Sequence, residues 1–252
     1  ISWEVARDAA FTQMLHSGSA STGQARDFTL KVDVQNLTPG QSYYYRFKAG
    51  SAVSPVGRMK TLPAAGVAQV RFAVLSCSNF PAGYFHAYAQ AAQESELDAV
   101  LHLGDYIYEY ATGEYATEDA AALGRSLPED NNGELFTLGD YRKRYALYRT
   151  DADLQALHAA APFIAVWDDH EVANDTWTDG AENHNDGEGD FNQRKLAALS
   201  RDRSFLIRAA IVIITVCVVL GFVARSLPKA GFDAEQAQQA LVEHVISYDS
   251  QR

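Results

Sequence analysis

The sequence has few cysteines and no excess of basic residues. Only two cysteines, Cys77 and Cys217, occur in 252 residues, and their contexts differ, which argues against a disulfide framework. The formal net charge is −11, and the acidic excess lies within residues 1–200. This charge excludes a general nucleic-acid-binding protein, because such proteins carry basic surfaces. An acidic chain is better suited to binding multivalent cations.

The sequence also lacks a leader-like start. Residues 1–5 read Ile-Ser-Trp-Glu-Val, which resembles the middle of a strand and not a signal peptide. We therefore expect the sequence to begin inside a domain, so the start gives no information about export.

Long hydrophobic runs are absent except near the C-terminus. Residues 205–224 contain a single charge, Arg208, and a run of about 20 apolar residues is long enough to span a bilayer. We predict a transmembrane helix there, and the alternative is a β-branched core strand or a buried helix. Residues 201–252 as a whole are predicted to be a tail unrelated to the rest of the chain.

Residues 1–63 have the pattern of an all-β domain. Apolar and polar residues alternate over 28–34, which predicts a half-buried strand, and further strands are predicted at 41–49 and 56–61. The Leu-Thr-Pro-Gly turn that leads into Tyr-Tyr-Tyr at 43–45 resembles the tyrosine corner of fibronectin-type sandwiches.

Residues 68–200 have the pattern of an α/β domain. Polar, glycine-rich stretches at 112–139 and 179–190 predict a long loop or lid and a second loop. Asp151 is the expected N-cap of the last helix in this region. The predicted strands are 69–76, 97–103 and 162–166, and the predicted helices are 84–95, 140–148 and 151–160.

Three of these strands end in polar groups. The ends read Ser-Cys-Ser-Asn at 76–79, Gly-Asp-Tyr-Ile-Tyr at 104–108 and Trp-Asp-Asp-His-Glu at 167–171. In a parallel sheet these ends lie at one edge, where open α/β sheets bind ligands. Oxygen ligands suit Ca²⁺, Mg²⁺ or Fe³⁺, whereas a thiolate and a phenolate favour iron or zinc. Because two neighbouring metals can stabilise a phosphoryl transfer, the pattern predicts a metal-dependent hydrolase.

Simpler interpretations exist for several of these residues. Cys77 could be a small buried apolar residue, and Asp105 could cap a helix. Tyr106 and Tyr110 could pack in the core as readily as Tyr108 could bind a metal.

Three further features have a structural interpretation. We expect His102 to be a hydrogen-bonded core histidine, and Asp168 to lie behind the ligands or to cap a helix. The acidic run at 179–190 is expected to be a solvated loop, with an additional calcium site as the alternative.

Taken in order, the three strand-end motifs resemble those of the PhoD-type alkaline phosphatases, a branch of the metallophosphoesterase superfamily. The similarity covers residues 1–199 and includes the Tyr-Tyr-Tyr-Arg-Phe-Lys strand at 43–48. The resemblance implies a fibronectin-like β-sandwich at 1–63, followed by a partial metallophosphoesterase α/β sandwich at 68–200.

The resemblance also implies the metal ligands. Cys77 and Tyr108 match iron-binding positions, Asp105 matches the aspartate that bridges the two metals, and Asp169 matches a ligand of the second metal. The implied cofactors are Fe³⁺ and Ca²⁺, with other divalent metals as alternatives.

The implied reaction is the hydrolysis of phosphate monoesters or diesters. His170 would contact the phosphate or protonate the leaving oxygen, and Asn79 would support the phosphate or a metal. The family is typically secreted, periplasmic or bound to the cell envelope, and it continues beyond this region with further metal ligands. The alternative is therefore a non-catalytic, membrane-tethered remnant whose β-sandwich binds a partner.

Overall fold

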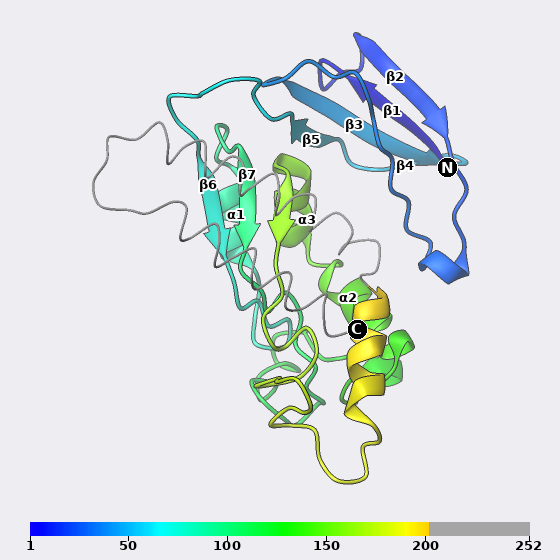
Figure 1. The fold of residues 1–252 in the computed structure, drawn as a ribbon, viewed down its shortest axis with the longest axis vertical. Coiled ribbons are helices and arrows are strands. Elements are labelled where there is room, and N and C mark those ends of the chain that lie inside the picture. Colours follow the sequence, from blue (N-terminus) through cyan, green and yellow to red (C-terminus); the bar gives the residue numbers. More distant parts are fainter. Residues whose placement is uncertain (202–252) are drawn as a thin grey trace.

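A computed structural model describes residues 1–201, which form two β-sheets, a linker between them and a set of helices that belong with the second sheet (Figure 1). The first sheet is antiparallel and has five strands, with the order β2-β1-β3-β4 and β5 paired to β3. The second sheet has three parallel strands in the order β6-β7-β8. The strands are β1 (Ser2–Ala6), β2 (Met14–Ser19), β3 (Ser42–Ala49), β4 (Ala52–Val53), β5 (Gly57–Lys60), β6 (Phe72–Leu75), β7 (Ala99–His102) and β8 (Phe163–Ala165).

The first sheet confirms the strands expected at 41–49 and 56–61. The hydroxyl of the buried Tyr43 accepts a hydrogen bond from the backbone N–H of Thr38 at 2.9 Å and donates one to its carbonyl at 3.3 Å. This bond has the form of a tyrosine corner. The described residues form one sheet here, so the fibronectin-like sandwich stays a prediction.

The strand expected at 28–34 is wrong, because these residues form no ladder. The side chains of this segment still alternate between exposed and half-buried positions. Its entry is, however, bent by left-handed backbone at Asp27 (φ 51°) and Phe28 (φ 52°), and the Phe28 side chain is exposed. Alternation therefore indicates that one side of the segment is half-buried. It does not show that a neighbouring strand is present to pair with the segment.

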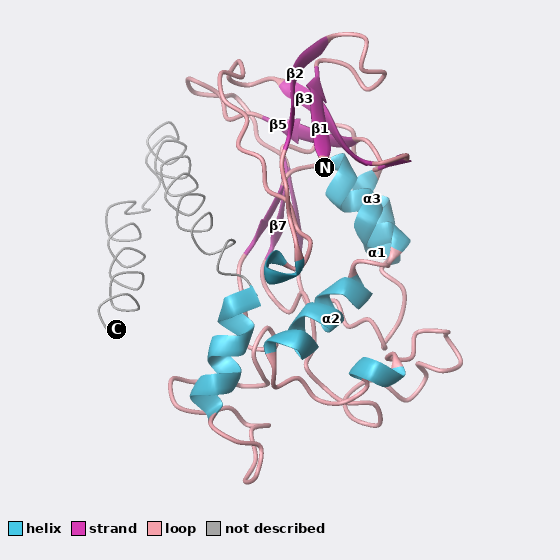
Figure 2. Ribbon diagram, turned by 90° about the vertical axis from the view of Figure 1, so that its right-hand side faces the viewer, coloured by secondary structure: helices cyan, strands magenta, loops and turns pink. Residues whose placement is uncertain are grey.

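The second sheet confirms the three strands expected at 69–76, 97–103 and 162–166, and these strands are parallel as expected. Its helices are α1 (His86–Ala92), α2 (Leu138–Tyr148) and α3 (Ala152–Ala160), with short 3-10 turns η1 (Gln24–Arg26) and η2 (Glu129–Asn131). Residues 191–201 are also helical. Figure 2 shows α1 and α3 side by side near the strands, with α2 beneath them.

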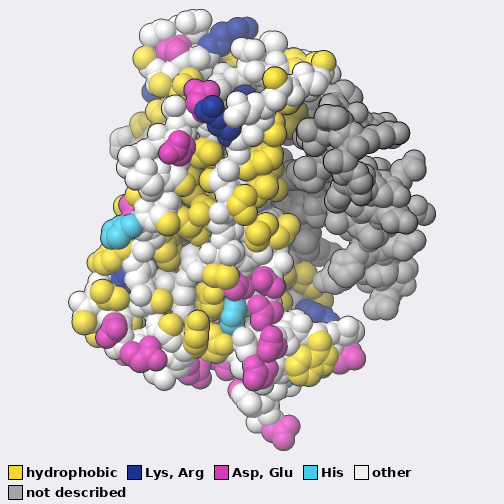
Figure 3. All heavy atoms as spheres, turned by 90° about the vertical axis from the view of Figure 1, so that its left-hand side faces the viewer, with side chains coloured by type: hydrophobic (Ala, Val, Ile, Leu, Met, Phe, Trp, Pro, Cys, Tyr) yellow, Lys and Arg dark blue, Asp and Glu magenta, His cyan; other side chains and the backbone are white. Residues whose placement is uncertain are grey.

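One face of the parallel sheet packs on helices, and the other is largely exposed. Val100 on β7 is fully buried beside Phe163 of β8. On the opposite face Phe72, Val74 and Val166 are exposed, and Figure 3 shows apolar side chains gathered on this side of the molecule. Parallel sheets are usually covered on both faces.

Helix boundaries follow from their caps. Asp151 caps α3 as expected, since its Oδ1 accepts hydrogen bonds from the N–H groups of Asp153 and Leu154 at 3.0 Å each. Helix α2 begins earlier than the predicted residue 140, because Thr137 and Asp140 form a capping box.

Polar side chains of β5 join the first sheet to the α/β region. The Arg58 side chain donates to the carbonyl oxygens of Ala160 at 2.8 Å and Leu97 at 3.0 Å. Lys60 forms an ion pair with Asp98, which precedes β7. Ala160 is the last residue of α3, and Leu97 and Asp98 precede β7. The first sheet is therefore fixed on the side of the α/β region opposite the carboxyl ends of the parallel strands.

Among residues 1–201, no helix is both long enough and apolar enough to cross a membrane. The predicted span at 205–224, like almost all of the tail at 201–252, lies outside the described residues.

The prediction of a satisfied core histidine at 102 is confirmed in part, because the buried Nδ1 of His102 has no hydrogen-bond partner within residues 1–201. His102 is fully buried on β7, and its Nε2 lies 2.9 Å from the hydroxyl of Tyr88. Burial lowers the pKa of His102 to about 4. The folded protein therefore resists protonation of this ring, whereas the unfolded chain accepts the proton near pH 6.5.

We predict that His102 makes the fold sensitive to mild acid. As the pH falls from 7.5 to 5, only the unfolded state takes up the proton, so His102 alone removes about 2 kcal/mol of stability. Urea unfolding followed by circular dichroism at the two pH values measures the loss. His102→Gln should weaken the dependence, and an unchanged dependence in this variant would contradict the assignment.

Candidate metal centre

The three predicted strand ends lie at one edge of the parallel sheet, as expected. The N–H of Cys77 donates to the carbonyl of Gly104 at 3.2 Å, and the N–H of Ser78 donates to the carbonyl of Asp105 at 3.0 Å. The N–H of Val166 likewise donates to the carbonyl of His102 at 2.9 Å. Pairing therefore extends beyond the strands and brings the polar ends together.

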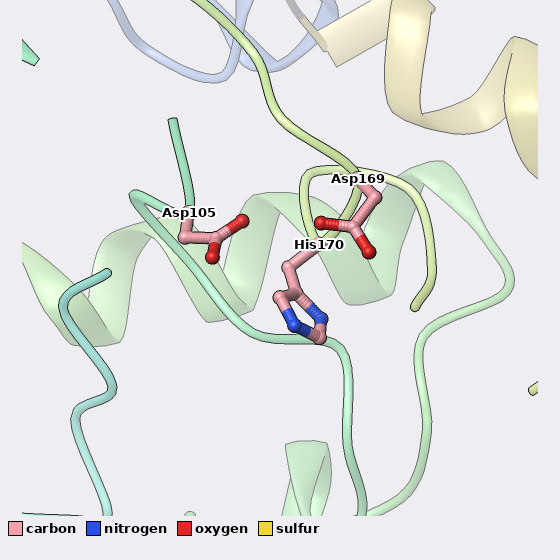
Figure 4. A group of neighbouring side chains, drawn as sticks. All are labelled: Asp105, Asp169 and His170. Atoms are coloured by element: carbon pink, nitrogen blue, oxygen red, sulfur yellow. The ribbon is translucent and has the colours of Figure 1, made fainter. Parts of the chain in front are cut away.

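Asp105, Asp169 and His170 form the centre of this edge. Each offers one oxygen or nitrogen atom, and these atoms all lie within 4.8 Å of one another. Figure 4 shows the two carboxylates facing each other with the imidazole beside them. Asp105 and His170 are buried and Asp169 is partly exposed, so the cluster opens to solvent on the side of Asp169. A group of this kind can hold a metal ion.

Cys77 and Tyr108 both contact Asp105. The thiol lies 3.4 Å and the phenol 3.1 Å from Asp105 Oδ2, and both donate to it. Cys77 is exposed, so its interpretation as a buried apolar residue is wrong. Tyr106 points elsewhere, with its hydroxyl 2.8 Å from His158 Nε2, and Tyr110 packs on the His170 ring.

The donor set fits a metal ion. Asp105 Oδ1 is buried and has no hydrogen-bond partner within residues 1–201, which is costly for a carboxylate oxygen in the absence of a cation. Burial raises the pKa of Asp105, an effect that the charge of His170 opposes, and burial also raises the pKa of Tyr108. A cation at this point would remove the penalty and would replace the thiol and phenol protons.

Left-handed backbone places two of these residues. Cys77 has φ 59° and Asp105 has φ 53°, values that non-glycine residues rarely adopt and that cluster at functional sites. Gly104, with φ 104°, precedes Asp105. The chain therefore turns sharply where each strand ends, and the turn directs the side chain of Asp105 toward Asp169.

Asn79 lies beside the cluster through an indirect contact. The hydroxyl of Tyr148 donates to Asn79 Oδ1 at 3.1 Å and accepts from the N–H of Tyr108 at 3.2 Å. The amide of Asn79 thus has its oxygen held and its NH₂ group available as a donor. Asn79 is not a member of the three-residue cluster.

Glu109 contacts the three-residue cluster, although the sequence motifs predict no role for it. It is fully buried, and its Oε2 lies 2.8 Å from His170 Nδ1. Its Oε1 accepts hydrogen bonds from Asn174 and Asn183 at 2.6 Å each. Burial alone would lower the pKa of His170, but the hydrogen bond and charge of Glu109 raise it. The signal in the sequence was a glutamate inside an otherwise aromatic motif.

Glu171 is the second such residue. It is 1% exposed and accepts three backbone hydrogen bonds, from Asp105, Tyr106 and Asp168. Burial raises the pKa of Glu171 to about 7, although these hydrogen bonds lower it. The side chain of Asp168 is exposed, and both interpretations of it stay predictions.

A buried arginine holds the backbone at Tyr108 and Tyr110. Arg144 on α2 donates to the carbonyl oxygens of Tyr108 at 2.6 Å and Tyr110 at 3.0 Å. It also donates to Asn131 and Gly133 in the predicted 112–139 loop. Within the described residues this loop contains no helix except the short turn η2 and the first two residues of α2, and Arg144 fixes it against the site.

Comparison with known proteins agrees with this geometry. Residues 72–201 match the family model described as PhoD-like phosphatase, and residues 1–63 match that of the PhoD-like phosphatase N-terminal domain. Alkaline phosphatase D of Bacillus subtilis (strain 168) is 45% identical over 176 residues. This alignment covers 69% of the present chain and 29% of the relative, so the chain spans less than a third of that relative's length.

A solved structure described as "Structure of PhoD" superposes on this chain. The TM-score is 0.70 with 40% sequence identity, over 79% of this chain and 37% of the other. The family models, the curated relative and the solved structure thus agree with one another, and the chain belongs to the PhoD-like phosphatase family.

Proposed function

We propose that this chain carries the metal centre of a phosphoric ester hydrolase similar to alkaline phosphatase D, acting on phosphate monoesters or diesters. The observation that carries the proposal is the convergence of Asp105, Asp169 and His170 within 4.8 Å. The cysteine and tyrosine that donate to Asp105 support it. Because the alignment covers only 29% of the relative, the activity of this chain is the first point to test.

Two metals would share the site. Cys77, Tyr108 and Asp105 would hold Fe³⁺, because a thiolate and a phenolate are suitable ligands for iron. Asp105 and Asp169 would hold Ca²⁺, which prefers carboxylate oxygens. The orphan Oδ1 of Asp105, beside an Oδ2 already facing the thiol and phenol, supports a bridging role for this carboxylate.

The catalytic work of the side chains falls to His170 and Asn79. When bound, the metals supply Lewis-acid polarisation of the phosphoryl group. Nδ1 of His170 faces Glu109, which leaves Nε2 to contact the phosphate and to give a proton to the leaving oxygen. The NH₂ group of Asn79, whose oxygen is held by Tyr148, would donate to an anionic phosphate oxygen.

Three further properties belong to the proposal. Residues 1–63 would be a fibronectin-like module beside a catalytic region at 68–200, and 201–252 would be an unrelated tail. The family resemblance suggests a secreted, periplasmic or envelope protein. A membrane anchor at 205–224 is part of the same proposal.

Asp105→Asn tests the centre directly. The amide carries no charge and offers one acceptor oxygen, so it should no longer bridge metals. Hydrolysis of p-nitrophenyl phosphate and of bis-p-nitrophenyl phosphate at alkaline pH, with Fe³⁺ and Ca²⁺ supplied, should fall to background. Asp98→Asn, which changes a carboxylate outside the site, is the control. Activity retained in Asp105→Asn would exclude this centre, and an inactive wild-type chain would favour the non-catalytic alternative.

Glu109→Gln tests the orientation of His170. The variant keeps the size of the side chain but loses the charge beside Nδ1, and removal of such a partner lowers activity by about 10- to 100-fold in metal sites. Steady-state kinetics on the same two esters measure the loss, with the exposed Glu118→Gln as control. Equal kinetics in the two variants would show that Glu109 does not act on His170.

A further inference from the structure

The carboxylate of Glu171 binds backbone N–H groups and does not face the three-residue cluster. We call this arrangement a backbone clamp. The side chain of Glu171 is 1% exposed, and both oxygens are occupied by backbone donors. Oε1 accepts from the N–H of Tyr106 at 2.6 Å, and Oε2 accepts from the N–H groups of Asp105 at 3.1 Å and Asp168 at 2.8 Å. Neither oxygen belongs to the cluster that could hold a metal.

These three donors come from two different strand ends. Asp105 and Tyr106 follow β7, whereas Asp168 follows β8, so one carboxylate ties the two ends together. The ends touch: a Cβ on Gly104 would lie 2.4 Å from the backbone nitrogen of Asp168 and 2.5 Å from its Cβ. Glycine is therefore required at 104, next to the N–H groups of Asp105 and Asp168 that Glu171 binds.

The clamp acts on an unfavourable backbone conformation. Asp105 has φ 53°, a left-handed conformation that non-glycine residues adopt uncommonly, although aspartate tolerates it better than most. Its own N–H and that of the next residue both point to Glu171. Release of these two bonds would let the backbone at residue 105 return to ordinary conformations, and the carboxylate would then turn away from Asp169 and His170.

We infer that Glu171 is the positioning residue of this site, because it holds Asp105 in the left-handed conformation that aims its carboxylate at Asp169 and His170. The role in metal binding rests on the proposed function, whereas the role as a backbone clamp does not. The two parts are tested by different measurements.

The test uses Glu171→Gln in the full chain. Glutamine keeps the shape but has one acceptor oxygen, and its NH₂ group would face a backbone N–H. We expect amide hydrogen exchange, followed by NMR, to speed up about tenfold or more at Asp105, Tyr106 and Asp168. Calorimetric titration with Ca²⁺ alone should show affinity lower by about 10- to 100-fold.

Asp151→Asn is the matched control. Asp151 is also buried, and it accepts two backbone hydrogen bonds on α3 and an ion pair from Arg125 at 2.7 Å. The Asp151→Asn variant should have a lower melting temperature. It should show no selective increase in amide hydrogen exchange at residues 105, 106 and 168, and no loss of Ca²⁺ affinity. This comparison separates positioning from general stability.

The outcomes distinguish the two claims. Unchanged exchange at the three amides in Glu171→Gln, or the same exchange pattern in both variants, would overturn the inference. Ca²⁺ affinity retained despite faster exchange would overturn the positioning of Asp105. A wild-type chain that binds no Ca²⁺ would contradict the proposed metal site. Amide hydrogen exchange in Glu171→Gln would still test whether Glu171 holds the backbone. If Glu171→Gln does not fold, Glu171→Asp, which is one methylene shorter, is measured in the same way.

Discussion

The site depends on the close contact between the ends of β7 and β8. At this point residue 104 has no room for a side chain, because a Cβ would overlap the backbone of Asp168. The contact brings Asp105 and Asp169, which are far apart in the sequence, to the same point in space. Asp105, the residue after Gly104, has left-handed backbone at this contact. The proposed metal centre depends on this contact between the ends of β7 and β8.

Buried polar groups surround this contact, and they satisfy one another almost completely. Glu171 accepts three backbone hydrogen bonds, and Glu109 binds His170 and two asparagines. Arg144 donates to carbonyl oxygens of Tyr108 and of Asn131 in the following loop. Unpaired polar atoms are expensive in such an environment. Within residues 1–201 the buried oxygens Asp105 Oδ1 and Asn183 Oδ1 have no partner, and Asp105 Oδ1 is the one in the three-residue cluster, where a cation would bind.

The sequence predicted the frame of the α/β region better than the contacts inside it. Apolar runs located β7 and β8, and Asp151 identified the start of α3, because strand burial and helix caps are local properties. The order of polar strand ends also predicted the cluster of Asp105 with Asp169. The roles of Glu109 and Glu171 were not predictable in this way, since each depends on backbone N–H groups or a ring supplied by another segment. The false strand at 28–34 has the same origin, because alternation is local and pairing is not.

In the proposed site Asp105, Cys77 and Tyr108 share a metal ion, and Fe³⁺ tests this sharing directly. A phenolate bound to Fe³⁺ gives visible charge-transfer absorption and enhanced phenolate ring modes in the resonance Raman spectrum. Addition of Fe³⁺ to the wild-type chain should produce these modes, and Tyr108→Phe should lack them. Their absence from the wild-type spectrum, or their persistence in Tyr108→Phe, would contradict the account.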